Sequence, residues 1–263
     1  MIRKTISLVY TAVGYVAGLV SLAYIAGFLM DFGVPKGIND GSNGPLWLAL
    51  VVDTALIAAF GLSHSIPARR WFKAWWDDTL PAELQRASYV ILTSLMTALL
   101  VGFWRPIPDV IWVVEEPAAI GAIIALYLCV WLMMAAATFH FGHFRFFGLA
   151  QGWARARARS MAGSSFSARL LYAIIRHPIS FGWITVPWIT PHMTTGQLVF
   201  ALGALVYVLI ATPFEEADLI EEFGDDYKQY RERVPAFIPG AKSRKRANAA
   251  IRKRLLRPRR RGF

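Results

Sequence analysis

The stretch TISLVYTAVGYVAGLVSLAYIAGFLM, which runs from Thr5 to Met30, contains no charged residue. A helix of about 20 apolar residues crosses the roughly 30 Å hydrocarbon core of a bilayer, because each residue rises about 1.5 Å. The stretch is therefore long enough to span a membrane. It follows Arg3 and Lys4 and has no evident small-residue cleavage site, so we expect it to act as a retained signal anchor.

Four further stretches repeat this pattern. The segments Ala87–Trp104, Ala118–Phe139 and Gln197–Phe214 carry no charge, and Leu46–Leu62 carries only Asp53. The whole chain is 56% hydrophobic and only 17% charged, with a mean hydropathy of +0.43, which does not suit a surface that faces water. We therefore predict an all-α, polytopic transmembrane protein with five long spans.

A sixth hydrophobic segment, Pro178–Pro191, is shorter and is interrupted by Pro187. A straight crossing is not expected from it, so we interpret it as a re-entrant helix or as half of a hairpin. The following Thr190–Gly196 contains Pro and Gly as turn residues and threonines that can cap the next helix.

The distribution of basic residues predicts the orientation, because loops rich in Lys and Arg stay in the cytoplasm. With six crossings, 26 of the 28 Lys and Arg residues fall on one side, and only Lys36 and Arg105 fall on the other. We predict a multi-pass protein of the inner membrane with both termini in the cytoplasm. The net charge of +11 is then a property of the cytoplasmic face, and nucleic-acid binding is not expected.

The segment 240–263 carries eleven of these basic residues and no acid. Such a tail favours contact with anionic lipid headgroups, while specific RNA binding is a weaker alternative. We therefore divide the chain into one membrane domain, 1–239, and a basic cytoplasmic tail. No obligate protein partner is indicated. The single cysteine, Cys129, excludes an internal disulfide and a cysteine-based metal cluster.

Polar residues gather where the chain re-enters the membrane after the long inside segment. Arg176, His177 and Pro178 are followed by Gly182 and Trp183. Proline suits the first turn of a helix, because the N–H that it lacks would be unpaired there. The group is either a basic interfacial anchor or part of a site.

A second polar group, Glu215, Glu216 and Asp218, follows the last uncharged stretch. It is either a solvated helix end or part of a site. Helical spacing places Glu216 within an apolar stripe formed by Leu219, Phe223, Tyr227, Tyr230 and Val234, provided that the helix continues past Gly224. We predict a cytoplasmic amphipathic helix and an inward-facing Glu216. A buried carboxylate needs a partner, either a protein side chain or a cationic ligand.

An aromatic run, Phe139–Phe147, contains His140 and His143 and is followed by Gln151. Two histidines without a third ligand are a weak zinc signal, so we predict no metal. Core packing and a substrate or cofactor pocket both remain open. Within the second span, Asp53 is either a functional residue or the buried partner of a hydrogen bond.

These motifs resemble, in order, those of the integral-membrane methyltransferases that include isoprenylcysteine carboxyl methyltransferases and nurim-like proteins. The resemblance begins with Arg176-His-Pro-x-x-x-Gly-Trp183 and a hydrophobic hairpin, and continues through Glu215-Glu-x-x-Leu-x-x-x-Phe-Gly to the prolines Pro235 and Pro239. Within this superfamily the chain looks most like bacterial methanethiol S-methyltransferases. That similarity rests on His64-Ser, Arg86-Ala-Ser-Tyr-Val90, Trp104-Arg-Pro-Ile-Pro108, His143-Phe-x-x-Phe-Gly-Leu-x-Gln151 and Pro191-x-Met-Thr-x-Gly196.

The resemblance implies transfer of a methyl group from S-adenosylmethionine to a small thiol, so that methanethiol becomes dimethyl sulfide. The catalytic part would cover about residues 140–239. The resemblance and the affinity of aromatic faces for a sulfonium cation together give the residues expected to bind the cofactor: Gln151, Arg176, His177, Pro178, Gly182, Glu215, Glu216, Tyr227 and Tyr230. Family members commonly carry a tyrosine at the second position after the proline, where this chain has Ile179-Ser180.

The substrate pocket is expected to contain His64, Phe144, Phe147 and Trp183. A thiol must lose its proton, and a histidine can accept it, so we take His143 as the first candidate for the catalytic base and His177 as the second. Three alternatives remain: a methyltransferase acting on a lipid or prenylcysteine carboxylate, a non-catalytic membrane scaffold, and a membrane reductase of similar architecture.

Overall fold

The computed structural model describes residues 2–42, 44–159 and 167–240, so the basic tail from residue 241 onward lies outside the described residues. Within the described part, five helices are long and apolar enough to cross a membrane, which confirms the all-α, multi-pass prediction. They are α1 (Ile2–Met30), α2 (Leu46–Ser65), α4 (Ala82–Phe103), α5 (Pro117–His140) and α10 (Thr195–Phe223).

Shorter elements join these spans. They are the 3₁₀ helix η1 (Ile66–Ala68), α3 (Arg70–Thr79), β1 (Val110–Val113), α6 (His143–Phe146), α7 (Leu149–Ala156), α8 (Leu171–Ile174), α9 (Pro178–Thr185), the 3₁₀ helix η2 (Val186–Trp188), β2 (His192–Thr194) and α11 (Asp225–Arg233).

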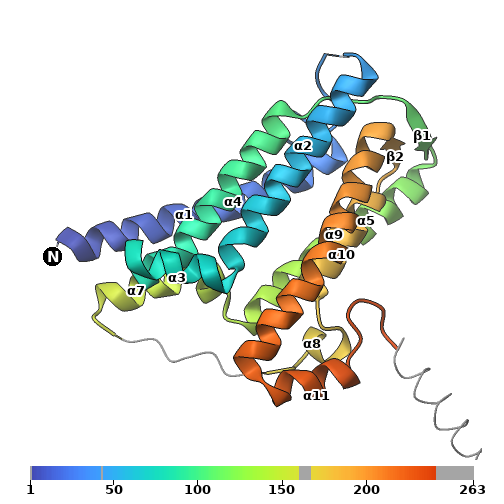
Figure 1. Cartoon of the computed structure of the whole chain (residues 1–263). Coiled ribbons are helices and arrows are strands. Elements are labelled where there is room, and N and C mark those ends of the chain that lie inside the picture. The colour runs from blue at the N-terminus through green and yellow to red at the C-terminus, as the bar shows by residue number, and fades with distance from the viewer. Residues whose placement is uncertain (1, 43, 160–166, 241–263) are drawn as a thin grey trace, which may run out of the picture.

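Two groups of long helices meet where α2 packs against α10. On one side, α1 packs against α4 and α7, and α4 also packs against α2; on the other, α9 packs against α5 and α10. Figure 1 shows the strands β1 and β2 at one end of the second group and the short helices α8 and α11 at the opposite end. The polar residues after α5 and at the end of α10 therefore lie away from the strand pair.

Asp53 is completely buried in α2 and anchors the chain just after α4. One of its carboxylate oxygens accepts the backbone N–H of Arg105 at 2.9 Å. The Lys36 ammonium donates to the carbonyl oxygens of Gly102 and Trp104 at 2.9 and 2.8 Å, which secures the last turn of α4. Of the two roles open to Asp53, the structure supports that of a buried hydrogen-bonding group, which needs such a partner to offset its burial.

The short hydrophobic segment forms a hairpin with α10, as predicted, and the structure adds a strand pair that we did not predict. After α9 and η2, β2 pairs antiparallel with β1, with Val113 opposite His192. The Thr194 hydroxyl accepts the N–H of Gln197 at 3.3 Å and so caps α10. The Gln197 side chain donates to the carbonyl of Pro187 at 3.1 Å. These short strands lie in segments rich in Pro, Thr and Trp, whose composition indicated loops.

The last long helix does not continue past Gly224, so the condition under which we placed Glu216 in the apolar stripe is not met. The helix α10 ends at Phe223, and Gly224 adopts a φ of +59°, a conformation that glycine reaches at low cost. The chain then starts α11 in a new direction. The predicted amphipathic helix is nevertheless present in α11, where Tyr227 and Tyr230 are buried. Glu216 is also buried, although the continuous helix from which we predicted its position does not exist.

Candidate functional site

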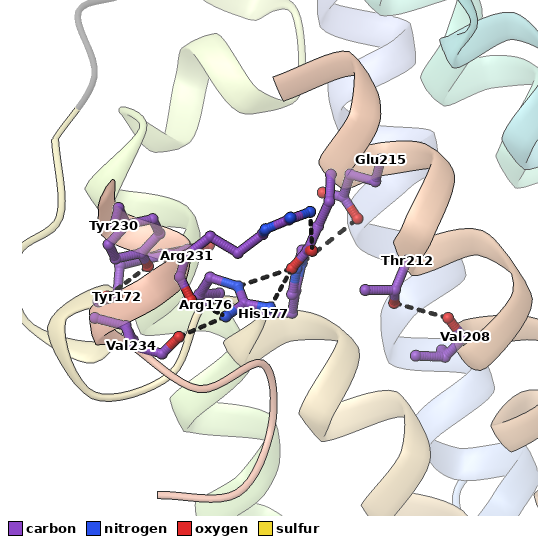
Figure 2. Close-up of polar contacts among 10 residues, drawn as sticks. Tyr172, Arg176, His177, Val208, Thr212, Glu215, Tyr230, Arg231 and Val234 are labelled. Atoms are coloured by element: carbon purple, nitrogen blue, oxygen red, sulfur yellow. Dashed lines mark hydrogen bonds and ion pairs between the residues drawn. The ribbon is translucent and has the colours of Figure 1, made fainter. Parts of the chain in front are cut away.

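Arg176, His177 and Glu216 form a buried ionic cluster where α9 begins and α10 approaches its end (Figure 2). One oxygen of the Glu216 carboxylate lies 2.7 Å from Nε and 2.5 Å from Nη2 of Arg176, and 3.2 Å from Nε2 of His177. Pro178 occupies the first turn of α9, as predicted, and places His177 directly before the helix. The predicted inward position of Glu216 is confirmed, and its partners are protein side chains.

The segment after α11 closes over this cluster. Nη1 of Arg176 donates to the carbonyl oxygens of Arg231 and Val234 at 3.0 and 2.5 Å. The backbone N–H groups of Arg176 and His177 donate to the carbonyls of Pro235 and Ala236 at 2.9 and 3.1 Å. The Val-Pro motif near the end of the described chain therefore supplies main-chain acceptors to the start of α9.

The hydrogen bonds of Arg176 engage all three of its nitrogens, so this guanidinium holds the protein together rather than offering a free cation to a ligand. Glu216 also faces Arg231, whose Nη1 lies 3.6 Å from its second oxygen. Burying such charges is costly unless each one is paired. Removing one partner leaves an unpaired buried charge, and this destabilises the fold more than replacing the whole cluster with apolar residues would.

Glu215 differs from its neighbour because its side chain is 53% exposed. Its carboxylate lies 3.6 Å from Nδ1 of His177. Burial raises the pKa of Tyr172 and Tyr227, and the negative charge of Glu215 adds to that rise. Glu215 is therefore an accessible negative charge beside His177.

Tyr172, Tyr227 and Tyr230, on α8 and α11, stay un-ionised at neutral pH. Burial raises the pKa of Tyr230 to about 12, and burial followed by the nearby carboxylates raises the pKa of Tyr172 and Tyr227. The Tyr230 hydroxyl donates to the carbonyl of Tyr172 at 2.6 Å and thereby ties α11 to α8. These phenols are neutral hydrogen-bonding groups and aromatic surfaces.

His143 lies in a separate aromatic cluster with α1. Its Nδ1 is 2.7 Å from the Thr138 hydroxyl and its Nε2 is 3.1 Å from the Tyr15 hydroxyl. Its ring stacks on Phe139 at 4.7 Å and also contacts Phe144 and Phe147. Burial lowers the pKa of His143 and so favours the neutral imidazole.

Gln151 belongs to this second region, where its amide donates to the carbonyl of Arg145 at 3.0 Å. Across residues 2–42, 44–159 and 167–240, no hydrogen bond or ion pair joins this region to Arg176, His177 or Glu216. The structure thus brings together only part of the predicted cofactor set, and the roles of Gln151 and His143 stay predictions.

The remaining predicted residues lie in two further places. Gly182 is buried where α9 meets α5, and a Cβ added there would fall 2.2 Å from the sulfur of Met134. The Trp183 ring packs against Trp131 of α5 at 5.5 Å. Both residues therefore have a packing role, whatever they contact besides.

His64, near the end of α2, lies apart from these groups and faces α4 and α10. Its Nε2 lies 2.8 Å from the Tyr89 hydroxyl and its Nδ1 lies 3.3 Å from Thr93. Its ring stacks on Phe60 at 5.7 Å and contacts Tyr207 at 6.4 Å. Sequence reasoning assigned no role to Tyr89, Tyr207 or Tyr172, and the only signal was the position of Tyr89 within the Arg86–Val90 motif.

The fold and the site define a class, namely multi-pass membrane proteins with a buried Arg-His-Glu cluster at one end of their last helix hairpin. Relatives that are similar over nearly the whole length of this chain identify the family within this class. The chain is 42% identical to methanethiol S-methyltransferase 2 of Bradyrhizobium diazoefficiens, covering 94% of this chain and 95% of the relative. It is 38% identical to methanethiol S-methyltransferase of Mycobacterium tuberculosis, covering 90% and 97%.

The chain therefore belongs to the methanethiol S-methyltransferase family. A more distant relative is nurim of Sus scrofa, which is 29% identical over 71% of this chain and 78% of its own length. No protein-family model matches the chain, and no solved structure matches it.

The buried cluster generates a prediction about stability. Glu216→Gln removes the charge that Arg176 faces, so we expect it to lower the free energy of unfolding by about 3–5 kcal/mol. Glu215→Gln is the matched control, because this half-exposed neighbour should change stability by no more than about 0.5 kcal/mol. Unfolding curves of both variants in the same detergent measure the difference, and equal curves would contradict a structural role for Glu216.

Proposed function

We propose that this protein transfers a methyl group from S-adenosylmethionine to methanethiol, producing dimethyl sulfide. Its membership of a family whose relatives are named for this substrate supports the acceptor. The structural observation that carries the proposal is the half-exposed Glu215 carboxylate beside a buried cluster in which Arg176 and Glu216 are already paired. A sulfonium cation is attracted both by a carboxylate and by aromatic faces.

The residues present fit such a donor. It supplies a methyl group already activated on a positively charged sulfur. Glu215 would lie nearest to that charge, with Tyr172 and Tyr227 adding phenol groups. Arg176, His177 and Glu216 would hold the start of α9 and the end of α10 in place, and this fixed frame would limit reorganisation during the reaction.

We also propose that the site opens on the cytoplasmic side of the inner membrane and that both termini lie there. The support is the distribution of Lys and Arg, from which we expect the loop bearing Glu115 to lie outside and α11 inside. Two shallow hollows of about 390 and 490 Å³ lie on the apolar outer faces of α1 with α4 and of α2, away from Arg176. We assign these faces to lipid.

The activity is tested directly with the purified protein in nanodiscs. We expect dimethyl sulfide, measured by gas chromatography, to form from methanethiol only when S-adenosylmethionine is added. A prenylcysteine methyl acceptor should give no methyl ester under the same conditions. Turnover of the prenylcysteine alone would instead favour a carboxyl methyltransferase, and the absence of any donor binding would favour a scaffold.

The role of Glu215 has a signature in binding. Glu215→Gln should weaken the affinity for S-adenosylmethionine about tenfold or more, which corresponds to about 1.4 kcal/mol. The affinity for S-adenosylhomocysteine, whose sulfur is uncharged, should change by less than about threefold on the same scale.

Calorimetry with each ligand measures the two changes in affinity. Glu222→Gln is the control, because Glu222 is exposed on the same helix. If Glu215→Gln weakens the binding of both ligands by the same factor, Glu215 does not interact with the positive charge of the sulfonium.

The orientation is tested by thiol labelling. In a Cys129→Ser background, Glu115→Cys should react with an impermeant maleimide added to spheroplasts, because Glu115 is exposed beside β1. Lys228→Cys, on α11, should react only after the membrane is permeabilised. The reverse pattern would place the termini outside.

A further inference from the structure

The helix α3, which connects the spans α2 and α4, has two unlike faces. At about 100° per residue, Lys73 and Asp77 fall on one side of it. Its aromatic residues fall on the other side, within an arc of about 140°: Trp71, Phe72, Trp75 and Trp76. Within this group the Phe72 ring contacts all three indoles at 5.1 to 5.6 Å. The helix therefore carries one continuous aromatic face and one charged face.

The aromatic face is largely uncovered by the described part of the protein. The side chains of Trp71 and Trp75 are 65% and 55% exposed, and Lys73 on the charged face is exposed as well. A charged side chain is stable in water, whereas a contiguous exposed apolar patch marks a surface that contacts a partner or a membrane. The two faces of α3 thus require different surroundings.

The position of α3 in the chain determines where it lies relative to the bilayer. It follows α2 through η1, and Pro81 separates it from α4, so both of its ends adjoin span ends at the same membrane surface. Its 10 residues form a helix about 15 Å long. Figure 1 shows α3 running across the ends of α2 and α4 rather than along them. Such a helix lies along the membrane surface.

Contacts at both ends of α3 fix the direction of its aromatic face. Just before the helix, Nη1 of Arg69 lies 2.9 Å from the carboxylate of Asp218 on α10. After the helix, the Gln85 amide of α4 donates to the Asp77 carboxylate at 2.8 Å and to the Leu80 carbonyl at 3.2 Å. Because it is held at both ends, α3 cannot turn its indoles inward without breaking these contacts.

The exposed apolar surface of the spans continues up to this helix. The Arg69 guanidinium lies 6.0 Å from the centre of the Phe214 ring, an exposed residue in the uncharged stretch of α10. Leu62, in the last turn of α2, is exposed as well. Exposed apolar residues on membrane spans face lipid, so the lipid-facing surface reaches the beginning of α3.

The charges of α3 do not favour lipids of either sign. Its sequence contains two basic and two acidic residues, so the helix has no net charge. A polybasic segment, in contrast, is attracted to anionic headgroups. Tryptophan prefers the boundary between headgroups and acyl chains, because indole combines a large apolar surface with one N–H donor. The aromatic face therefore suits this boundary without any requirement for anionic lipid.

We propose that α3 is an interfacial helix whose Trp71 and Trp75 insert between the phospholipid headgroups of the leaflet in which α2 ends. The partner is the phospholipid bilayer itself, held by aromatic insertion rather than by charge attraction. In the proposed orientation this is the cytoplasmic leaflet. The pair of Arg69 and Asp218 then also holds Glu215, about one helical turn away, near this surface, a consequence that rests on the proposed function.

The test uses two residues of α3 that are both exposed but point to opposite sides. In a Cys129→Ser background, Trp75→Cys and Lys73→Cys each carry one nitroxide spin label on the full chain in nanodiscs. Electron paramagnetic resonance compares collisions with oxygen, which concentrates among the acyl chains, and with a nickel chelate, which stays in water. We expect the ratio of oxygen to nickel collisions to be about fivefold or more higher at position 75 than at position 73.

Two controls accompany this comparison. Trp71→Cys repeats the measurement on the aromatic face, so that the result does not depend on one substitution. Nanodiscs of phosphatidylcholine with and without phosphatidylglycerol should give the same ratios, because aromatic insertion does not need anionic lipid.

The other outcomes contradict the proposal in different ways. Frequent nickel collisions at both positions would place the aromatic face in water. Rare collisions with both reagents at positions 71 and 75 would show that a protein surface covers it, such as a second copy of this chain. Ratios that rise only with phosphatidylglycerol would replace aromatic insertion by charge attraction. A failure of methyl transfer, in contrast, would refute the proposed function and leave these ratios unchanged.

Discussion

The buried Glu216 carboxylate is the interaction on which the rest of the site depends. It joins the first residues of α9 to the last turns of α10, two segments that are separated by the whole length of the hairpin. Arg176 then extends the connection to the carbonyls after α11. One carboxylate therefore fixes three chain segments relative to one another. The three polar motifs of the sequence, at Arg176, Glu216 and Val234, therefore meet at one place although they are far apart in the chain.

The two adjacent glutamates show how one helix separates structure from chemistry. Consecutive residues on a helix differ by about 100° in direction, so Glu216 points into the packed cluster while Glu215 points to a half-exposed side. A charge that is already neutralised by Arg176 cannot attract a ligand strongly. Its neighbour, held in place by the same helix turn, can do so. One dipeptide thus supplies both the buried carboxylate that holds the structure, Glu216, and the exposed carboxylate that can face a ligand, Glu215.

Much of this arrangement could be predicted from the sequence because the relevant signals are local. Uncharged runs revealed the spans, Pro178 indicated the start of α9, and the apolar stripe placed Glu216 and the tyrosines inward. The break at Gly224 stayed open in the sequence, because a glycine can lie within a helix or end it with a positive φ. The partners of His64 were equally hidden, since Tyr89 lies on another helix and side-chain contact between spans leaves no periodic trace.

His143 and His64 each face one threonine and one tyrosine hydroxyl, which shows why residue type alone does not identify a base. His143 stands in a richer aromatic motif than His64, and it is the first candidate for the catalytic base from the sequence. Both imidazoles have the same two kinds of hydrogen-bond partner, so their intrinsic chemistry is alike. The difference lies in the elements around them: His64 contacts Tyr89 of α4 and Tyr207 of α10, whereas His143 contacts Tyr15 of α1 and Thr138 of α5. Hydrogen bonds to a threonine and a tyrosine hydroxyl are also what a buried neutral imidazole needs, so a base is identified by its access to the substrate proton rather than by these partners.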